Sequence, residues 1–331
     1  MILHPTVIAN LLASYICSFM LVYASYYGAQ ILRHWNIASG DELQLVLERK
    51  TYLISTLLIY AFALQLLSLF LYIFTADTLC PLFVGAMCAA GTLNVNAFGY
   101  PTLVLKIMNF LLAGLWLVLN YADNKGYDYP LIKKKYLLLA LITPFIVLET
   151  ILESAYFFDM QADVIVSCCG SLFSDEHAAG LGSEIASLPE KPMMWVFYLA
   201  MLITLSSGLF FYFSGKGGYL FAGLSVLMFI VSLVSIVSFI SLYIYELPTH
   251  HCPFCIIMEE YGYIGYLLYI PLFGAVVAGM GVGTLIPFRK VESLKQVLDG
   301  LIGKLALSSV VLFGMFTLVA TYQIIFSNLI M

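Results

Sequence analysis

Eight long apolar stretches, almost free of charge, limit the folds open to this chain of 331 residues. A helix needs about 20 mostly apolar residues to cross a bilayer. We expect such helices near residues 6–32, 51–76, 101–121, 136–158, 193–214, 218–245, 261–287 and 304–329. The composition agrees, because only 10% of the residues are charged, against roughly a quarter in soluble domains. The sequence therefore predicts an all-α, polytopic membrane helix bundle.

The positive charges predict how these helices are oriented, because Lys and Arg accumulate in short cytoplasmic loops. If the first helix runs from outside to inside, the cytoplasmic loops and helix ends carry Arg33, Arg49, Lys50, Lys125, Lys133, Lys134, Lys135, Lys216, Arg289, Lys290, Lys295 and Lys304. Only Lys191 then lies outside, while Lys106 falls within the third helix. We therefore expect both termini on the extracytoplasmic side, with the chain in the bacterial inner (cytoplasmic) membrane.

We expect a single integral membrane domain over residues 1–331, with the lipid bilayer as its main partner. No stretch is long enough for a separate soluble domain, and the longest predicted outer loop covers residues 159–192. The second outer loop of each half contains a Thr followed by Cys-Pro, which is compatible with tandem halves 1–158 and 193–331.

Six of the seven cysteines fall in three breaks between predicted helices, and the predicted orientation places all three breaks on the extracytoplasmic side. The six are Cys80 and Cys88, Cys168 and Cys169, and Cys252 and Cys255. Cysteines gathered on one membrane face indicate thiol chemistry or soft-metal capture there. The seventh, Cys17, lies within the first helix, where a lone cysteine usually acts as a small hydrophobe.

The string Cys-Pro-Phe-Cys at residues 252–255 is the sharpest of these signals. Two cysteines separated by two residues close a small, reversible disulfide ring. We expect the seventh helix to begin just after the motif, so that its N-terminus favours the thiolate and lowers its pKa. The same spacing suits a metal pair, for which His250 and His251 are candidate further ligands.

The other two cysteine pairs leave their partners open. Cys168 and Cys169 are adjacent and would close only a strained, easily reduced ring, so they suit a shuttle pair, separate distant partners or a soft metal. Cys80 and Cys88 would stand about 12 Å apart on one straight helix, whereas a disulfide needs Cα atoms within about 7 Å. Either this segment bends or the two cysteines have different partners.

Charged residues inside the membrane form a second group of candidates. Glu149 and Glu153 share one face of the fourth predicted helix, and Lys106 on the third is their natural partner. They form either an ion pair that holds the two helices together or a proton path and polar wall beside a quinone. Tyr263 and Tyr266, at the start of the seventh helix, are either interfacial anchors or walls of a quinone pocket.

Several cofactor and ligand classes have no sequence support. No histidine lies inside a predicted helix, so a membrane haem b held by two core histidines is not expected. There is no CxxCH motif for covalent haem attachment and no phosphate loop. Nothing in the sequence suggests nucleic-acid binding.

The arrangement resembles the membrane disulfide-generating proteins and the vitamin K epoxide reductases. Proteins of these families carry a CxxC at the outer end of a membrane helix, a second cysteine pair in an outer loop, and a quinone between helices. The motif at 252–255 matches the first element, and Cys80 with Cys88, or Cys168 with Cys169, would match the second. Their core has four helices rather than eight, and adjacent shuttle cysteines are not part of their pattern.

The resemblance implies a membrane thiol–disulfide oxidoreductase that exchanges electrons between outer cysteine pairs, a thioredoxin-like partner and a membrane quinone. One alternative is a protein that binds or transports a soft metal, such as copper or mercury, through the outer Cys and His residues. Another is a structural membrane subunit of a larger complex, with loops stapled by disulfides.

Overall fold

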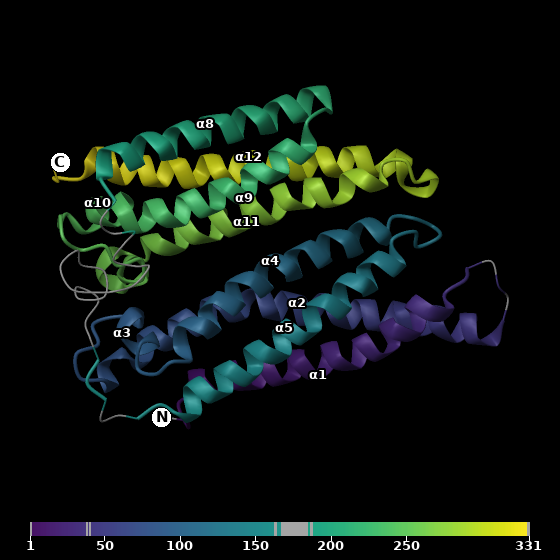
Figure 1. The fold of residues 1–331 in the computed structure, drawn as a ribbon, viewed down its shortest axis with the longest axis horizontal. Coiled ribbons are helices and arrows are strands. Elements are labelled where there is room, and N and C mark those ends of the chain that lie inside the picture. Colours follow the sequence, from purple (N-terminus) through teal and green to yellow (C-terminus); the bar gives the residue numbers. More distant parts are fainter. Residues whose placement is uncertain are drawn as a thin grey trace. The chain divides into compact units, whose positions relative to one another are not determined.

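The computed structural model describes residues 2–37, 39, 41–161, 164–166, 185 and 188–329, and these ranges are helical with connecting turns (Figure 1). Eight helices in these ranges are long and apolar enough to cross a membrane, which confirms the predicted fold class. They are α1 (Pro5–His34), α2 (Glu42–Leu79), α4 (Gly99–Asp123), α5 (Ile132–Phe158), α8 (Glu190–Ser214), α9 with α10 (Gly218–Ser235 and Ser241–Tyr245), α11 (Ile264–Leu285) and α12 (Lys295–Phe326). The predicted orientation of the termini stays a prediction.

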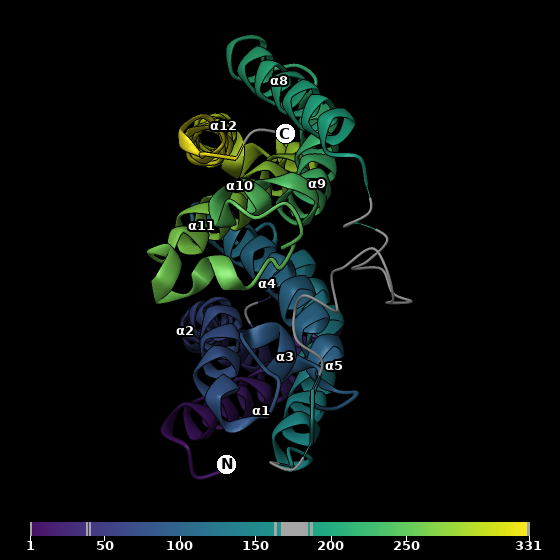
Figure 2. The same cartoon turned by 90° about the vertical axis from the view of Figure 1, so that its left-hand side faces the viewer.

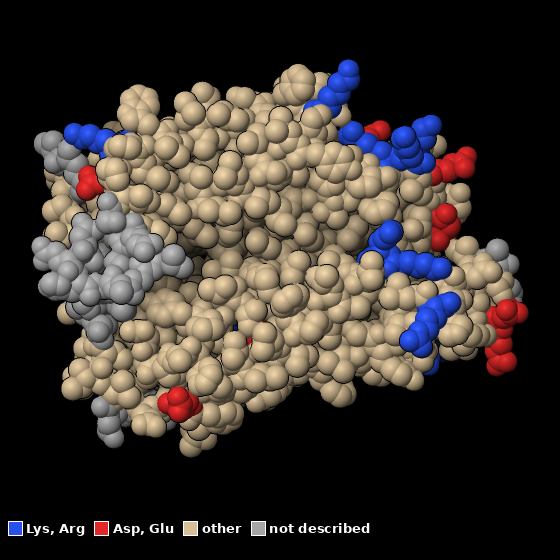
Figure 3. Space-filling model, in the orientation of Figure 1, with Lys and Arg blue, Asp and Glu red and all other residues tan. Residues whose placement is uncertain are grey.

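The surfaces of these helices suit lipid rather than water. Large apolar side chains such as Phe19, Phe213 and Leu318 are 75%, 81% and 71% exposed. In the face shown in Figure 3, the sides of the helices carry few acidic or basic residues, which lie mostly near the helix ends. Because a soluble protein rarely exposes extended apolar surface, the chain is an integral membrane protein.

The first of two compact units comprises Met1–Thr75, Asn96–Gln161 and Pro287–Asp299. It contains α1, α4, α5 and most of α2, and α5 packs along both α1 and α4 (Figures 1 and 2). Its core includes Phe62 against Trp116, whose ring centroids lie 4.8 Å apart. Lys135, predicted on the cytoplasmic side, is buried in the first turn of α5, with its Nζ 2.8 Å from the Oδ2 of Asp123.

The second unit comprises Ala76–Val95, Ala162–Ile286 and Gly300–Met331. In it α9 packs against α8 and α11, and the π-helical turn Ile236–Ile240 joins α9 to α10. A Cβ atom at Gly279 would lie 2.3 Å from the hydroxyl oxygen of Ser225, so only glycine permits this approach of α11 to α9. Small residues of this kind allow close helix packing in lipid.

Candidate functional site

A short irregular segment between α10 and α11 carries the CxxC motif. The chain leaves α10 through Glu246, whose backbone is left-handed with φ 56°, and forms two 3₁₀ helices, η3 (Cys255–Ile257) and η4 (Glu259–Tyr261). Pro253 within the motif fixes its own φ and donates no backbone hydrogen bond, which favours a turn over a continued helix. Both cysteines are thus held on a tight turn that precedes α11.

Two tyrosine hydroxyls and a histidine fix this segment in place. Tyr245 donates its hydroxyl proton to the carbonyl of Cys252, and Tyr269 donates to the carbonyl of Pro253 at 2.7 Å. His251 places Nδ1 3.0 Å from the carbonyl oxygen of Val237, and because that oxygen only accepts, this nitrogen carries the proton. These hydrogen bonds satisfy backbone groups of a buried turn, which would otherwise be costly to bury.

A second segment of the same unit brings Cys88 to the motif. After α2 the chain forms the 3₁₀ helix η1 (Cys80–Leu82) and turns at Gly85, whose φ of +91° favours glycine. The amide of Val166 donates to the carbonyl of Val84 at 3.0 Å and ties down this turn. Cys88 then precedes the short helix α3 (Ala89–Leu93) in an extended conformation. The segment bends, as one of the two sequence-based alternatives requires.

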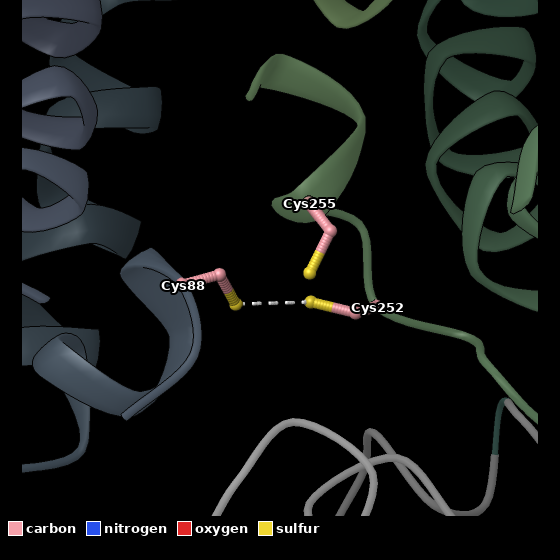
Figure 4. Close-up of side chains that lie close together, drawn as sticks. All are labelled: Cys88, Cys252 and Cys255. Atoms are coloured by element: carbon pink, nitrogen blue, oxygen red, sulfur yellow. Dashed lines mark hydrogen bonds between the residues drawn. The ribbon is translucent and has the colours of Figure 1, made fainter. Parts of the chain in front are cut away.

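The side chains of Cys88, Cys252 and Cys255 converge on one point, and we call them the sulfur cluster (Figure 4). The Sγ atoms of Cys88 and Cys252 lie 3.5 Å apart, and all three sulfurs lie within 4.8 Å of one another. The residues are 0%, 0% and 5% exposed, respectively. Since a disulfide bond is about 2.05 Å long, the 3.5 Å separation is a contact between two thiols.

The sulfur cluster bears on two expectations from the sequence. The predicted activation by the N-terminus of the seventh helix is wrong, because α11 begins only at Ile264 and Cys255 opens a 3₁₀ helix of three residues. Among the described residues, the cysteine outside the motif whose sulfur contacts that of Cys252 is Cys88, 164 positions earlier in the chain. Cys80 is buried at the start of η1 and is not one of the three clustered sulfurs. The predicted sites Cys168 and Cys169 lie outside the described residues.

The histidines and tyrosines named from the sequence have separate positions. The ring of His250 packs against Tyr245 at a centroid distance of 4.5 Å, and neither His250 nor His251 belongs to the group of three possible metal-binding side chains. Tyr263 is half exposed, and its ring centroid lies 6.3 Å from that of Tyr266. A quinone pocket at these two tyrosines stays a prediction.

The charged residues predicted inside the membrane form one buried network in the first unit, which we call the carboxylate–lysine cluster. The Nζ of Lys106 lies 2.8 Å from the Oε1 of Glu149 and 3.2 Å from the Oε2 of Glu153, and all three side chains are at most 1% exposed. The predicted ion pair between the third and fourth membrane helices is therefore confirmed. Its donors Gln65 and Asn109, also buried, were missed, although polar residues in apolar spans are a usable sequence signal.

Comparison with protein-family models, curated proteins and solved structures finds no match for this chain.

Proposed function

We propose that this integral membrane protein is a thiol–disulfide oxidoreductase whose exchange centre is the sulfur cluster. One observation carries the proposal: the thiol of Cys88 touches Cys252 of a CxxC pair, with all three sulfurs within 4.8 Å. Thiol–disulfide exchange needs this arrangement, because an attacking sulfur must reach one sulfur of an existing disulfide. Cys252 is the member shared between two alternative bonds.

The proposed reaction has two steps, and atoms and electrons balance in each. Loss of two electrons and two protons joins Cys252 to Cys255 and leaves Cys88 as a thiol. The Cys88 thiolate then attacks the Cys252 sulfur, so that a Cys88–Cys252 bond forms while the Cys252–Cys255 bond breaks, and the proton lost by Cys88 ends on Cys255. The second step changes no electron count and moves the disulfide from one segment to the other.

Burial is compatible with this chemistry. A thiol beside a disulfide is uncharged and weakly polar, so both can be taken out of water at little cost. A set of three thiolates around a metal ion would carry net negative charge for a monovalent or divalent ion, and burying it requires compensating charges or donors. The exchange centre therefore makes the smaller electrostatic demand on its surroundings.

The remaining parts of the proposal concern where the electrons go. A membrane quinone would take the two electrons and two protons to give a quinol, with Tyr263 and Tyr266 as its candidate contacts. A thioredoxin-like partner would exchange through Cys168 and Cys169, because buried sulfurs need an intermediary to reach a soluble protein. The twelve positive residues of the predicted loops and helix ends support a bacterial inner membrane location with the cluster on the extracytoplasmic side.

A soft-metal site is the second candidate, because three soft sulfur ligands lie within 4.8 Å of one another. Metal–thiolate bonds of about 2.3 Å place sulfurs roughly 3.8–4.0 Å apart in tetrahedral or trigonal geometry, so the 3.5 Å between the Sγ atoms of Cys88 and Cys252 would have to widen slightly. Cys252, Cys255 and Cys88 would then be the ligands, with Cys88 in the place that the sequence suggested for His250 or His251.

Cysteine variants in native membranes test the exchange centre. Membranes are reduced, treated with a short-chain quinone, alkylated and analysed by mass spectrometry for cross-linked peptides. We expect both a Cys252–Cys255 and a Cys88–Cys252 disulfide in the unmodified protein. Cys255→Ser should retain only the second and Cys88→Ser only the first, while Cys252→Ser should lose both.

Cys17→Ser is the matched control, because Cys17 is a buried cysteine of the first unit whose thiol contacts the carbonyl of Ala61 at 3.4 Å. It should behave as the unmodified protein. Three thiols that stay alkylatable after oxidation would overturn the exchange centre. Stoichiometric copper, zinc or mercury in the purified protein, lost in Cys252→Ser but not in Cys17→Ser, would favour the metal site. Disulfides that resist strong reductant in the folded protein would indicate structural staples.

A further inference from the structure

The carboxylate–lysine cluster contains two acidic groups and one basic group, all buried. Lys106 comes from α4, and Glu149 and Glu153 come from successive turns of α5. If both carboxyls were ionised, the cluster would hold one uncompensated negative charge inside the membrane. Such a charge is costly there, and the usual solution is that one group takes up a proton.

Hydrogen bonding shows which carboxyl is built to stay ionised. Glu149 accepts bonds on both oxygens, from the Nε2 of Gln65 at 2.9 and 2.7 Å and from the Nδ2 of Asn109 at 2.6 Å, besides the Nζ of Lys106 at 2.8 Å. A carboxylate surrounded by donors is stabilised in its charged form. Glu149 is therefore the counterion of Lys106.

Only one of the two carboxyl oxygens of Glu153 accepts hydrogen bonds. Its Oε2 accepts from the hydroxyl of Ser14 and from Lys106, whereas its Oε1 is buried and has no hydrogen-bond partner among the described residues. An ionised carboxylate leaves a buried oxygen in this state only at a large cost, while a protonated carboxyl carries no charge. This bare oxygen is the carboxyl position in the cluster that is open to a proton.

We propose that Glu153 is a proton-binding site within the membrane, which takes up and releases a proton while Glu149 and Lys106 remain an ion pair. The charged groups that face it are Lys106 from α4 and Glu149 from its own helix. The uncharged groups are the hydroxyl of Ser14 and the thiol of Cys17 from α1 and the phenol of Tyr72 from α2. The site lies wholly in the first unit and does not depend on the thiol chemistry of the second.

Carbodiimide labelling of the full-length protein in lipid nanodiscs tests the proposal. Dicyclohexylcarbodiimide reacts with a protonated carboxyl: the acid proton goes to a nitrogen, the carboxyl oxygen bonds to the central carbon, and the acyl group then migrates to nitrogen. We expect the label on Glu153 and not on Glu149. Above the midpoint of its titration, labelling should fall about tenfold for each pH unit, following the protonated fraction.

The control variants are Glu153→Gln, which should abolish the label, and Glu149→Gln, which leaves Glu153 as the carboxylate paired with Lys106 and should therefore reduce its labelling. Preferential labelling of Glu149, or protection by sodium ions at constant pH, would overturn a proton site at Glu153. Infrared spectra give a readout that does not depend on reagent access. The carbonyl band of a protonated carboxyl should be present in the unmodified protein and absent in Glu153→Gln, and a spectrum unchanged by this substitution would also overturn the proposal.

Discussion

Replacing Lys106 by Met removes the only positive charge of the carboxylate–lysine cluster while keeping a side chain of similar length. The Nζ lies 2.8 Å from Glu149 and 3.2 Å from Glu153, so the substitution leaves a buried carboxylate without its counterion. Breaking a buried pair on one side typically costs about 3–5 kcal/mol. We therefore expect a large loss in the free energy of unfolding.

The size of this loss has an upper limit, because Glu149 can take up a proton instead of remaining charged. Protonating a carboxyl with the usual pKa of about 4.3 costs about 1.4 kcal/mol per pH unit, or about 3.7 kcal/mol at pH 7. The folded variant would then bind one proton that the unfolded chain does not. Its stability relative to the unmodified protein should fall as pH rises from 5 to 7 and recover as pH is lowered.

Unfolding by sodium dodecyl sulfate in mixed micelles, followed by circular dichroism at several pH values, measures the effect. The double variant Lys106→Met with Glu149→Gln should recover most of the loss, because no uncompensated charge remains, and Glu153→Gln alone should be nearly silent. Two results would refute the assignment of charges. One is a free energy of unfolding of Lys106→Met within about 1 kcal/mol of that of the unmodified protein. The other is a double variant that is no more stable than Lys106→Met alone.

Three further predictions concern the second unit. Gly85→Ala should open the loop before Cys88 to proteolysis, because a Cβ there would lie 2.3 Å from the carbonyl oxygen of Val166 and φ is +91°; unchanged digestion would contradict this. Tyr269→Phe removes a 2.7 Å hydrogen bond to the CxxC turn. It should lower the free energy of unfolding by about 1 kcal/mol and speed the alkylation of Cys252, and an alkylation rate equal to that of the unmodified protein would contradict this. The backbone and side-chain amides of Asn328 lower the pKa of Glu246 below its usual value, so this contact should persist above pH 4.5 and be lost as pH falls through the lowered pKa. Hydrogen exchange would show the loss as a smaller protection of the Asn328 amide relative to its intrinsic rate at each pH.

The membrane helices were predictable because the features that define them lie within a single continuous stretch of sequence. A run of apolar residues long enough to span lipid must be helical to satisfy its backbone, and sequence alone shows such runs. Two ends were misplaced: α2 begins at Glu42 rather than near residue 51, and α12 at Lys295 rather than near residue 304. The helical hydrogen-bond pattern continues through polar residues that hydropathy assigns to loops.

The sulfur cluster was predictable only in part, because its parts are joined by tertiary packing. The CxxC pair is visible in four consecutive residues, whereas Cys88 reaches it across 164 positions through a bend at Gly85 that no periodicity indicates. The start of α11 at Ile264 lies close to the predicted start of the seventh span at residue 261, but the sequence does not show that two 3₁₀ helices separate it from the motif. Buried donors such as Gln65 could have been found from polar residues in apolar spans.

Whether the sulfur cluster and Glu153 are coupled can be tested through the change in net charge that each reaction of the sulfur cluster produces. Coupling between two sites is reciprocal and requires that the state of one changes the free energy of the other. Oxidation of two neutral thiols to a neutral disulfide leaves the net charge of the second unit unchanged, so it should not alter proton binding at Glu153. Binding of a cation to two or three thiolates, in contrast, changes that net charge through the protons it displaces.

We therefore expect the redox midpoint of the sulfur cluster, measured by thiol alkylation against a dithiothreitol buffer, to have the same pH dependence in Glu153→Gln as in the unmodified protein. The carbodiimide labelling of Glu153 should likewise be the same before and after oxidation. A pH dependence altered by Glu153→Gln would show that electron transfer at the cysteines is linked to this proton, and the two sites would then have to be treated as one mechanism. Labelling that responds to added copper but not to oxidation would instead favour the metal site.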